Sequence, residues 1–452
     1  MSRTGIKHVD VAIIGAGASG CANAYMLSRY TNARSVAIFD RHKAVAQANS
    51  GSLHNSQTLH CGDIETNYSR EKAEEVKATA NMVANYVRQQ PDAAEIGFRM
   101  PKMVLAVGEA EIAHLRERWS WLQQSFPYLS WLEAADIAAM EPSVMAGRTE
   151  PVAAIGVADR VAAIDFAALS RSLLAQAQQA QQDKQDAEPL DVQLGNPVET
   201  LVATVNGYTL QTAQGVWQAR AVLVCAGGHS LLYAQRMGYG HEYTCLPMAG
   251  NYYTAPACLK GKVYTVQNDK LPFAAVHGDV DVLNPAQTRF GPTTWPIRRL
   301  ERYLSTSKRD FKAVEGAASV APKALLKWFR DADLRPFMLR NMVYQVPGLR
   351  RYSFLRQARK VVPELQRKNL TRANGVGGLR PQLIDRTTLS IVPGEVKMDT
   401  GAGLIFNMTP SPGATSCLGN AWKDTQSIGR VLGLNVDAQR VQQELLTGDG
   451  AA

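Results

Sequence analysis

The apolar positions of the first forty residues predict a strand, a turn, a helix and a second strand. Residues 9–14 (VDVAII) are almost continuously apolar, which is typical of a strand buried on both faces of a parallel sheet. Small and apolar residues then continue to residue 27 and predict a helix, and residues 35–40 (SVAIFD) form a second strand. This order predicts a strand–helix–strand unit at the start of an α/β protein.

The same analysis predicts further elements along the chain. An amphipathic helix covers 69–90, with Ser69 as its cap, and a strand over 102–108 precedes a helix over 109–126. A helix over 164–188 ends in a Gln-rich tail. From 246 to 295 the chain is strand-like with Pro and Gly punctuation, which predicts an antiparallel sheet.

The turn after the first strand carries glycines at a spacing that binds dinucleotides. In GAGASG, Gly15 permits a tight turn, Gly17 lets a pyrophosphate approach the backbone, and Gly20 lets the helix pack on the strand. The helix N-terminus offers free N–H groups to the phosphates. Asp40, twenty residues after Gly20, is placed to hold ribose hydroxyls. The alternative is a glycine-rich βα turn in an unrelated α/β protein.

Features of a nucleotide-binding fold return late in the chain, which favours FAD over NAD. Residues 219–230 form a buried strand that closes on Gly227, and residues 403–421 form a strand, a turn and a helix beginning around Gly413 to Thr415. An NAD domain would be one contiguous block, whereas a flavoprotein of the glutathione-reductase type leaves the nucleotide fold and returns to it. We therefore predict an α/β fold with a discontinuous, Rossmann-like FAD-binding domain (1–95, 151–245 and 371–452) and an antiparallel-sheet substrate domain with helices (96–150 and 246–370).

Composition restricts the remaining possibilities. With 46% hydrophobic and 20% charged residues the chain is an ordinary globular protein. No apolar run reaches the roughly 18–20 residues that span a bilayer, and no signal peptide is expected. The six cysteines form no CxxC pair, which indicates reduced thiols in the cytoplasm, with neither disulfides nor a metal site.

Most of the net charge of +9 lies in one segment, 321–360, with ten basic and two acidic residues. Bulky apolar residues are mixed with the basic ones, a composition typical of an element that lies on an anionic membrane surface. The alternative is a solvated helical face over a core. We find no nucleic-acid-binding motif and expect no nucleic-acid partner.

The loop around SLHNSQTLHCGD (52–63) gathers hydrogen-bonding side chains without helical or strand periodicity. NSGSLHNSQTLHCGDIETNYS (49–69), GVGGLRPQLIDR (375–386) and TPSPGAT (409–415) together resemble the malate:quinone oxidoreductase family, in its short bacterial form, over essentially the full length. The broader relatives are flavin-dependent hydroxy-acid and amino-acid dehydrogenases, including L-2-hydroxyglutarate dehydrogenase, which is similar at the first and third segments.

The resemblance implies non-covalent FAD and the transfer of two electrons from L-malate to a membrane quinone, by a cytoplasmic protein bound peripherally to the inner face of the cell membrane. It argues against a covalent flavin link through His54 or Cys61. The residues expected to contact FAD are Gly15, Gly17, Ala18, Ser19, Gly20, Asp40, Arg41, Ser50, His54, Asn55, Ser56, Gln57, Val198, Ala226, Gly227, Gly413, Ala414 and Thr415.

Oxidation of a 2-hydroxy acid requires a base at the hydroxyl, a clamp for the carboxylate, and C2 placed so that its hydride passes to flavin N5. Histidine suits the base because its unperturbed pKa, about 6.5, lies near working pH. His60 is the candidate base and His277 the second; for each the alternative is a histidine hydrogen-bonded in a packed core. Arg380 is the expected clamp, and Tyr252 or Tyr264 would bind the second carboxylate.

Two other functions stay open from the sequence. The first keeps the flavin but acts on L-2-hydroxyglutarate or lactate, with oxygen as a possible acceptor. The second is a dinucleotide-binding sensor without catalysis. The sequence leaves undecided the chain length of the acid, the quinone and its site, and the oligomeric state.

Overall fold

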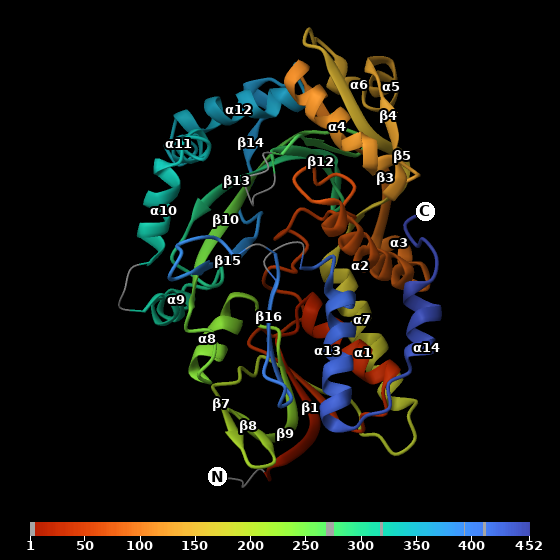
Figure 1. Cartoon of the computed structure of the whole chain (residues 1–452), viewed down its shortest axis with the longest axis vertical. Coiled ribbons are helices and arrows are strands. Elements are labelled where there is room, and N and C mark those ends of the chain that lie inside the picture. Colours follow the sequence, from red (N-terminus) through yellow and green to blue (C-terminus); the bar gives the residue numbers. More distant parts are fainter. Residues whose placement is uncertain (1–4, 268–274, 317–319, 393, 410–412) are drawn as a thin grey trace.

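The computed structural model describes residues 5–267, 275–316, 320–392, 394–409 and 413–452, and of Ala321 the backbone alone. Two β-sheets lie one above the other along the long axis of the molecule (Figure 1). The central part of the TPSPGAT segment, residues 410–412, lies outside the described residues.

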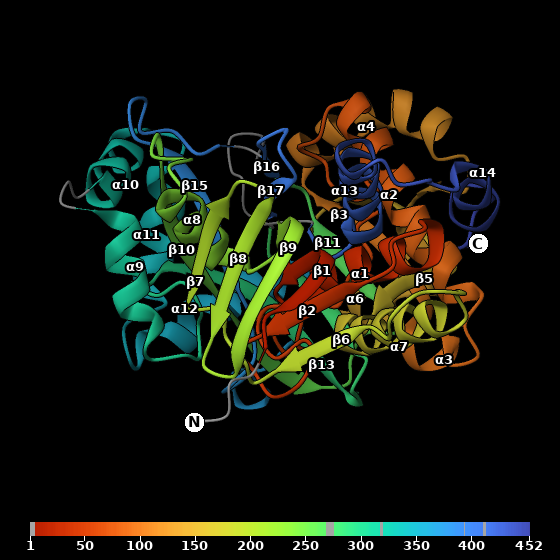
Figure 2. The same ribbon diagram turned by 90° about the horizontal axis from the view of Figure 1, so that it is seen from below.

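The first sheet contains the predicted dinucleotide motif. In the described residues it has eight strands, and its main path runs β16-β17-β9-β1-β2-β6, with β7 and β8 extending from β9 (Figure 2). Neighbours from β17 through β9, β1 and β2 to β6 are parallel. The strands are β1 (Lys7–Ile14), β2 (Val36–Asp40), β6 (Asp191–Leu194), β7 (Thr200–Thr204), β8 (Gly207–Thr212), β9 (Gly215–Val224), β16 (Val396–Asp399) and β17 (Leu404–Met408).

Helices and a hairpin cover the two faces of this sheet, which explains why its central strands are apolar on both sides. Val11 and Ile13 of β1 pack under α1 (Ala18–Tyr30), α7 (Phe166–Gln182) and α13 (Cys417–Leu432). Ala12 and Ile14 face the opposite side, toward the β7–β8 hairpin and α8 (Ser230–Arg236).

The second sheet is mixed rather than purely antiparallel. Over the described residues its main path runs β14-β10-β13-β12-β11-β3-β5-β4, and β15 pairs with β10. The single exception to antiparallel pairing among these described pairs is β11 beside β3. The strands are β3 (Gly97–Val107), β4 (Ser130–Leu132), β5 (Val152–Ile164), β10 (Tyr243–Pro256), β11 (Lys262–Thr265), β12 (His277–Asp281), β13 (Asn284–Pro296), β14 (Thr371–Arg372) and β15 (Leu379–Asp385).

Apart from α14, which packs against α1 beside the first sheet, the remaining helices lie around the second sheet and the junction between the sheets (Figure 1). They are α2 (Arg70–Arg88), α3 (Ala93–Ile96), α4 (Glu109–Ser125), α5 (Ala134–Met140), α6 (Pro142–Met145), α9 (Ser307–Glu315), α10 (Val320–Arg330), α11 (Arg335–Val343), α12 (Leu349–Val361) and α14 (Ala438–Val441). No helix in the described part of the chain is both long and apolar enough to cross a membrane.

The predicted mixed α/β fold class is confirmed, and several elements lie where the patterns put them. Ser69 caps α2 by accepting a hydrogen bond from the backbone of Lys72 at 3.2 Å. The C-terminal helix begins at Cys417, two residues after the expected stretch.

The predicted domain boundaries do not coincide with the sheets. β5 falls within the expected FAD-binding segment 151–245 and β15 within 371–452, yet both belong to the second sheet. The chain crosses between the two sheets as often as the patterns indicated, but two of the crossings come later, after β5 and after β15, because β5 pairs with β3 and β15 pairs with β10.

Candidate active site

One pocket begins at the glycine turn after β1 and extends to the second sheet. Its wall also includes Phe166, Met248, Thr294 and Asn407, which no sequence motif indicated. The predicted residues that line it are Gly15, Gly17, Ala18, Ser19, Asp40, Arg41, Ser50, His54, Asn55, Ser56, His60, Val198, Ala226, Gly227, Tyr252, Arg380, Gly413, Ala414 and Thr415. Among the described residues, Gly20, Gln57, Tyr264 and His277 are not part of the wall.

The turn has the shape that a pyrophosphate needs. Gly15 has φ +110°, and a Cβ there would lie 2.4 Å from the carbonyl oxygen of Cys225. A Cβ on Gly20 would lie 1.7 Å from the carbonyl oxygen of Gly15, so Gly20 lets α1 approach the turn, as predicted. Gly17, which precedes α1, has no side chain to cap the helix, and the helix N-terminus faces the pocket with N–H groups for an anion.

Asp40 shapes the turn as well as facing the pocket. One carboxylate oxygen accepts a hydrogen bond from the backbone of Ala16 at 2.7 Å, and the other accepts one from His42 at 2.8 Å. Burial raises the pKa of Asp40, while these two N–H donors oppose the rise. The hydroxyl of Ser50 accepts a hydrogen bond from the backbone of Ala18, the first residue of α1, at 3.0 Å. A carboxylate at the end of β2, beside the N-terminus of this helix, fits the ribose and pyrophosphate of a dinucleotide.

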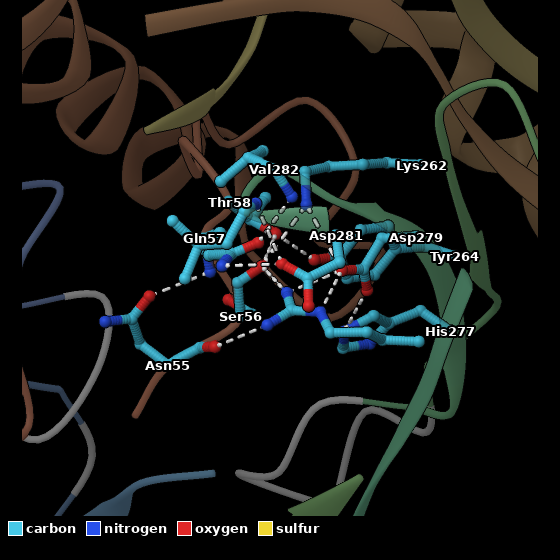
Figure 3. A network of polar contacts seen from close by, with 12 residues as sticks. Asn55, Ser56, Gln57, Thr58, Lys262, Tyr264, His277, Asp279, Asp281 and Val282 are labelled. Carbon is cyan, nitrogen blue, oxygen red and sulfur yellow. Dashed lines mark hydrogen bonds and ion pairs between the residues drawn. The ribbon is translucent and has the colours of Figure 1, made fainter. Parts of the chain in front are cut away.

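The loop over 48–58 is closed by its own hydrogen bonds. His54 Nδ1 lies 2.7 Å from the carbonyl oxygen of Ala48, and Asn55 donates to the carbonyl of Gly51 at 2.9 Å. Gln57, with φ +55°, is fully buried and directed at β12, where its amide donates to Asp281 at 3.2 Å (Figure 3). Gln57 was expected at the flavin; the structure instead shows it anchoring the loop to the second sheet.

Two buried, positively charged side chains of the second sheet contact the loop on its side away from the pocket. Lys262 and Arg289 donate to the carbonyl oxygen of Ser56 at 3.2 and 3.0 Å, and Arg289 also donates to Asp279 at 2.7 Å (Figure 3). All three charged side chains are fully buried. Burial lowers the pKa of Lys262 to about 8; burial also opposes ionisation of Asp279, but the charges of Lys262 and Arg289 outweigh it and lower the pKa of Asp279.

His60 faces the pocket and has a carboxylate behind it. Its Nδ1 lies 2.5 Å from Glu65 Oε1, and its Nε2 lies 3.4 Å from the hydroxyl of Ser56. The backbone N–H of His60 donates to Thr415 at 3.3 Å, which ties the loop to the C-terminal segment. Sequence reasoning missed Glu65; the one signal available was an acidic residue five positions after the histidine in the same loop.

His277, the second candidate base, lies in the protein interior. Its ring stacks on Tyr264 with centroids 4.3 Å apart, and its Nδ1 lies 3.1 Å from the carbonyl oxygen of Ala275. Burial lowers the pKa of His277 to about 4. The hydroxyl of Tyr264 is engaged with Thr58 at 2.6 Å. Neither side chain reaches the wall of the pocket, whereas His60 and Tyr252 do.

Arg380 and Tyr252 enter the pocket from neighbouring strands. Arg380 pairs with Met248 across β15 and β10, and its side chain has no hydrogen bond or ion pair with any described residue. Tyr252 is 4% exposed, and the guanidinium of Arg289 lies 5.2 Å from its ring centre. Arg380 is half-buried on the pocket wall, and a guanidinium without a carboxylate partner among the described residues fits a carboxylate ligand.

Comparisons with known proteins agree with this geometry. The model of the FAD dependent oxidoreductase family matches residues 10–422. A probable malate:quinone oxidoreductase of Campylobacter jejuni is 39% identical over 97% of this chain and 99% of its own length. A malate:quinone oxidoreductase of Helicobacter pylori is 37% identical, with 96% and 97% covered. The solved L-α-glycerophosphate oxidase of Mycoplasma pneumoniae with FAD bound has a TM-score of 0.62 at 19% identity and 99% coverage of both chains, which indicates a shared fold.

Replacing His277 by Asn is expected to reduce the loss of folding stability that the protein undergoes in mild acid. The pKa of His277 is about 4 in the folded protein and about 6.5 in an unfolded chain, so the unfolded state binds one proton more between these values. The contribution of His277 to stability is present above pH 6.5 and is lost as the pH falls to 4, a loss of ~3 kcal/mol.

The measurement is the free energy of unfolding in urea from pH 7 to pH 4.5. His277→Asn should flatten its decline with falling pH, whereas the exposed His241→Asn should keep the wild-type slope. Equal slopes in wild type and His277→Asn would contradict the assignment of a buried, neutral His277.

Proposed function

The chain belongs to the malate:quinone oxidoreductases, within the FAD dependent oxidoreductase family, and from that premise we propose that it oxidises L-malate to oxaloacetate and passes the electrons to a membrane quinone. FAD is the cofactor of the family, and the glycine turn, Asp40 and the loop over 48–58 fit it. The observation that carries the proposal is that His60 and Arg380 line the same pocket as the dinucleotide motif.

In this proposal bound FAD accepts two electrons from the hydroxy acid, and the protein binds and deprotonates the acid. Arg380 holds one carboxylate, because a guanidinium offers parallel N–H donors that match a carboxylate. His60 accepts the hydroxyl proton through Nε2, the nitrogen on the side of Ser56. Tyr252, whose pKa burial raises to about 12, stays protonated and donates a hydrogen bond to the second carboxylate.

A panel of hydroxy acids tests the reaction class. Purified protein that carries FAD should bleach anaerobically with L-malate faster than with L-2-hydroxyglutarate or L-lactate, and turnover should require a soluble quinone rather than oxygen. Faster bleaching with another acid would mean that the protein is a flavoenzyme whose substrate is that acid rather than L-malate. No bleaching with any acid would favour the non-catalytic sensor.

Arg380→Lys is expected to raise KM for malate about 10- to 100-fold while the content of FAD stays near that of the wild type. Lysine keeps the positive charge but loses the bidentate geometry, which corresponds to about 1.5–3 kcal/mol of binding. Steady-state kinetics and the flavin absorbance of the purified variant measure the two effects. Arg309→Lys, on the exposed face of α9, is the matched control; an unchanged KM in Arg380→Lys would place the clamp elsewhere.

The helices α10, α11 and α12 form the surface proposed to bind anionic lipid. Each buries an apolar face against the rest of the protein, as Trp328 and Phe354 do. The outer face is different, because it combines exposed basic residues with large apolar side chains that are 43–59% exposed. The apolar ones are Leu326, Leu339, Met342, Val346, Leu349 and Tyr352.

This combination fits an amphipathic element lying at a membrane interface, where basic residues meet lipid phosphates and apolar side chains insert. Figure 1 shows the three helices along one outer side of the molecule. Respiratory quinones lie in the bilayer, so an enzyme docked there, at the inner face of the cell membrane, could exchange electrons with them.

Replacing Lys323, Arg330, Arg335 and Arg356 by Gln is expected to weaken binding to anionic liposomes by more than 100-fold, since each basic residue near such a surface contributes about 1 kcal/mol. High salt should reduce wild-type binding in the same way. Activity with a water-soluble quinone should stay near that of the wild type. Liposome co-sedimentation at low and high salt is the measurement.

The matched control removes the same four charges elsewhere, in Arg70, Lys72, Lys423 and Arg430 of α2 and α13. Equal loss of binding in both variants would mean that net charge acts rather than this surface. If the wild-type protein does not bind anionic liposomes at low salt, the membrane-docking proposal is wrong.

A further inference from the structure

We propose that Glu65 is the positioning residue of His60: its carboxylate holds the imidazole with Nδ1 protonated, so that Nε2 is the nitrogen free to accept a proton in the pocket. The inference rests on the proposed role of His60 as the base. It extends that role to a residue that does not line the pocket itself.

The contact is direct and shielded from water. His60 Nδ1 and Glu65 Oε1 are 2.5 Å apart, with the histidine side chain 15% and the glutamate side chain 5% exposed. A carboxylate only accepts hydrogen bonds, so Nδ1 is the donor, and in the neutral imidazole Nε2 then carries the lone pair. Nε2 then lies toward Ser56, on the side that lines the pocket.

The loop that carries Glu65 is fixed independently of His60. Asp63 forms a fully buried ion pair with Lys102 at 2.7 Å and accepts a hydrogen bond from Tyr128 at 3.0 Å. Gly62, with φ +80°, lets the loop approach α2, because a Cβ there would lie 2.3 Å from the carbonyl oxygen of Ala73. Glu65 is therefore presented to the imidazole by a rigid turn.

An oriented carboxylate would affect the reaction in two ways. It keeps the tautomer in which Nε2 can act as a base, and it stabilises the positive charge that the imidazole gains when it accepts the proton. Proton transfer from the hydroxyl would therefore be easier with Glu65 than with a neutral side chain in its place.

The other groups around the pair keep one charge state across mildly acidic pH. Burial raises the pKa of Cys61 to about 12 and that of Tyr264 well above its usual range, and it lowers the pKa of His277 to about 4. The pKa of Tyr68 is also raised, first by burial and then by the charge of Glu65. The other ionisable side chains nearby are Asp63, Lys102, Arg380 and Glu395. Lys262, with a pKa of about 8, changes charge at higher pH, so only the acid limb of a pH profile is informative.

The test is a double-mutant cycle of Glu65→Gln and His60→Gln, read as the anaerobic rate of flavin reduction by the hydroxy acid that reduces the wild type fastest. Glu65→Gln should slow reduction about 10- to 100-fold, the size of effect found where a group that orients a histidine is replaced. His60→Gln should slow it by about 10²–10⁴. The double variant should be no slower than His60→Gln, because Glu65 acts through His60.

The cycle separates the two proposals. Normal reduction in His60→Gln would overturn His60 as the base. Slow reduction in His60→Gln with a normal rate in Glu65→Gln would keep the base and overturn the role of Glu65. A further loss in the double variant, or loss of FAD and of thermal stability in Glu65→Gln, would mean a structural role only.

Two further readouts report the orientation itself. The acid limb of the pH profile should move to lower pH in Glu65→Gln and should return toward the wild type in Glu65→Asp. In ¹⁵N spectra of the histidine-labelled protein, the His60 signal, identified by its absence in His60→Gln, should show a protonated Nδ1 in the wild type. An Nε2-protonated ring in the wild type would overturn the proposal. Glu75→Gln, in an exposed ion pair on α2, is the matched control for both readouts.

Discussion

The carbonyl oxygen of Ser56 accepts hydrogen bonds from two buried cations, Lys262 and Arg289, and the shape of the pocket depends on that contact. Burying two positive charges is unfavourable unless a negative charge and hydrogen-bond acceptors compensate them. Asp279 supplies the charge and the loop carbonyls supply the acceptors. Movement of the loop would leave buried charged donors without these acceptors, which is unfavourable, so the contact holds the loop against the second sheet.

That position explains how residues from both sheets reach one pocket. The loop over 48–58 lies between the two sheets: its front lines the pocket with His54, Asn55 and Ser56, while Gln57 is bonded to Asp281 behind it. The 377–380 segment packs against the same loop, since the backbone of Leu379 donates to the side chain of Asn49 at 3.1 Å. The proposed cofactor contacts of this loop and the proposed carboxylate clamp are thus positioned by a single segment.

Different parts of the molecule meet different physical demands. The pocket uses buried charges in fixed positions, where the low dielectric strengthens each interaction and a misplaced group is costly. The outer face of α10, α11 and α12 instead exposes basic and apolar side chains together, an arrangement suited to a charged, apolar interface rather than to water alone. Mutations in the pocket are therefore expected to change the reaction without changing the proposed membrane contact, and mutations on the outer face of these helices are expected to do the reverse.

Local rules were sufficient for the first part of the structure. Gly15, Gly17 and Gly20 were assigned from the spacing that a strand, a tight turn and a helix impose, and α2 was assigned from its periodicity and its Ser69 cap. The family resemblance placed His60 and Arg380 at the site, and both line the pocket.

Long-range pairing decided the features that these local rules do not predict. Whether β5 and β15 join the first or the second sheet depends on strands far away in sequence. The direction of Gln57, the burial of His277 and the pairing of Glu65 with His60 depend on charges that the fold brings together. A sequence pattern records spacing along the chain, whereas a buried charge is stabilised only by the partners that surround it in space.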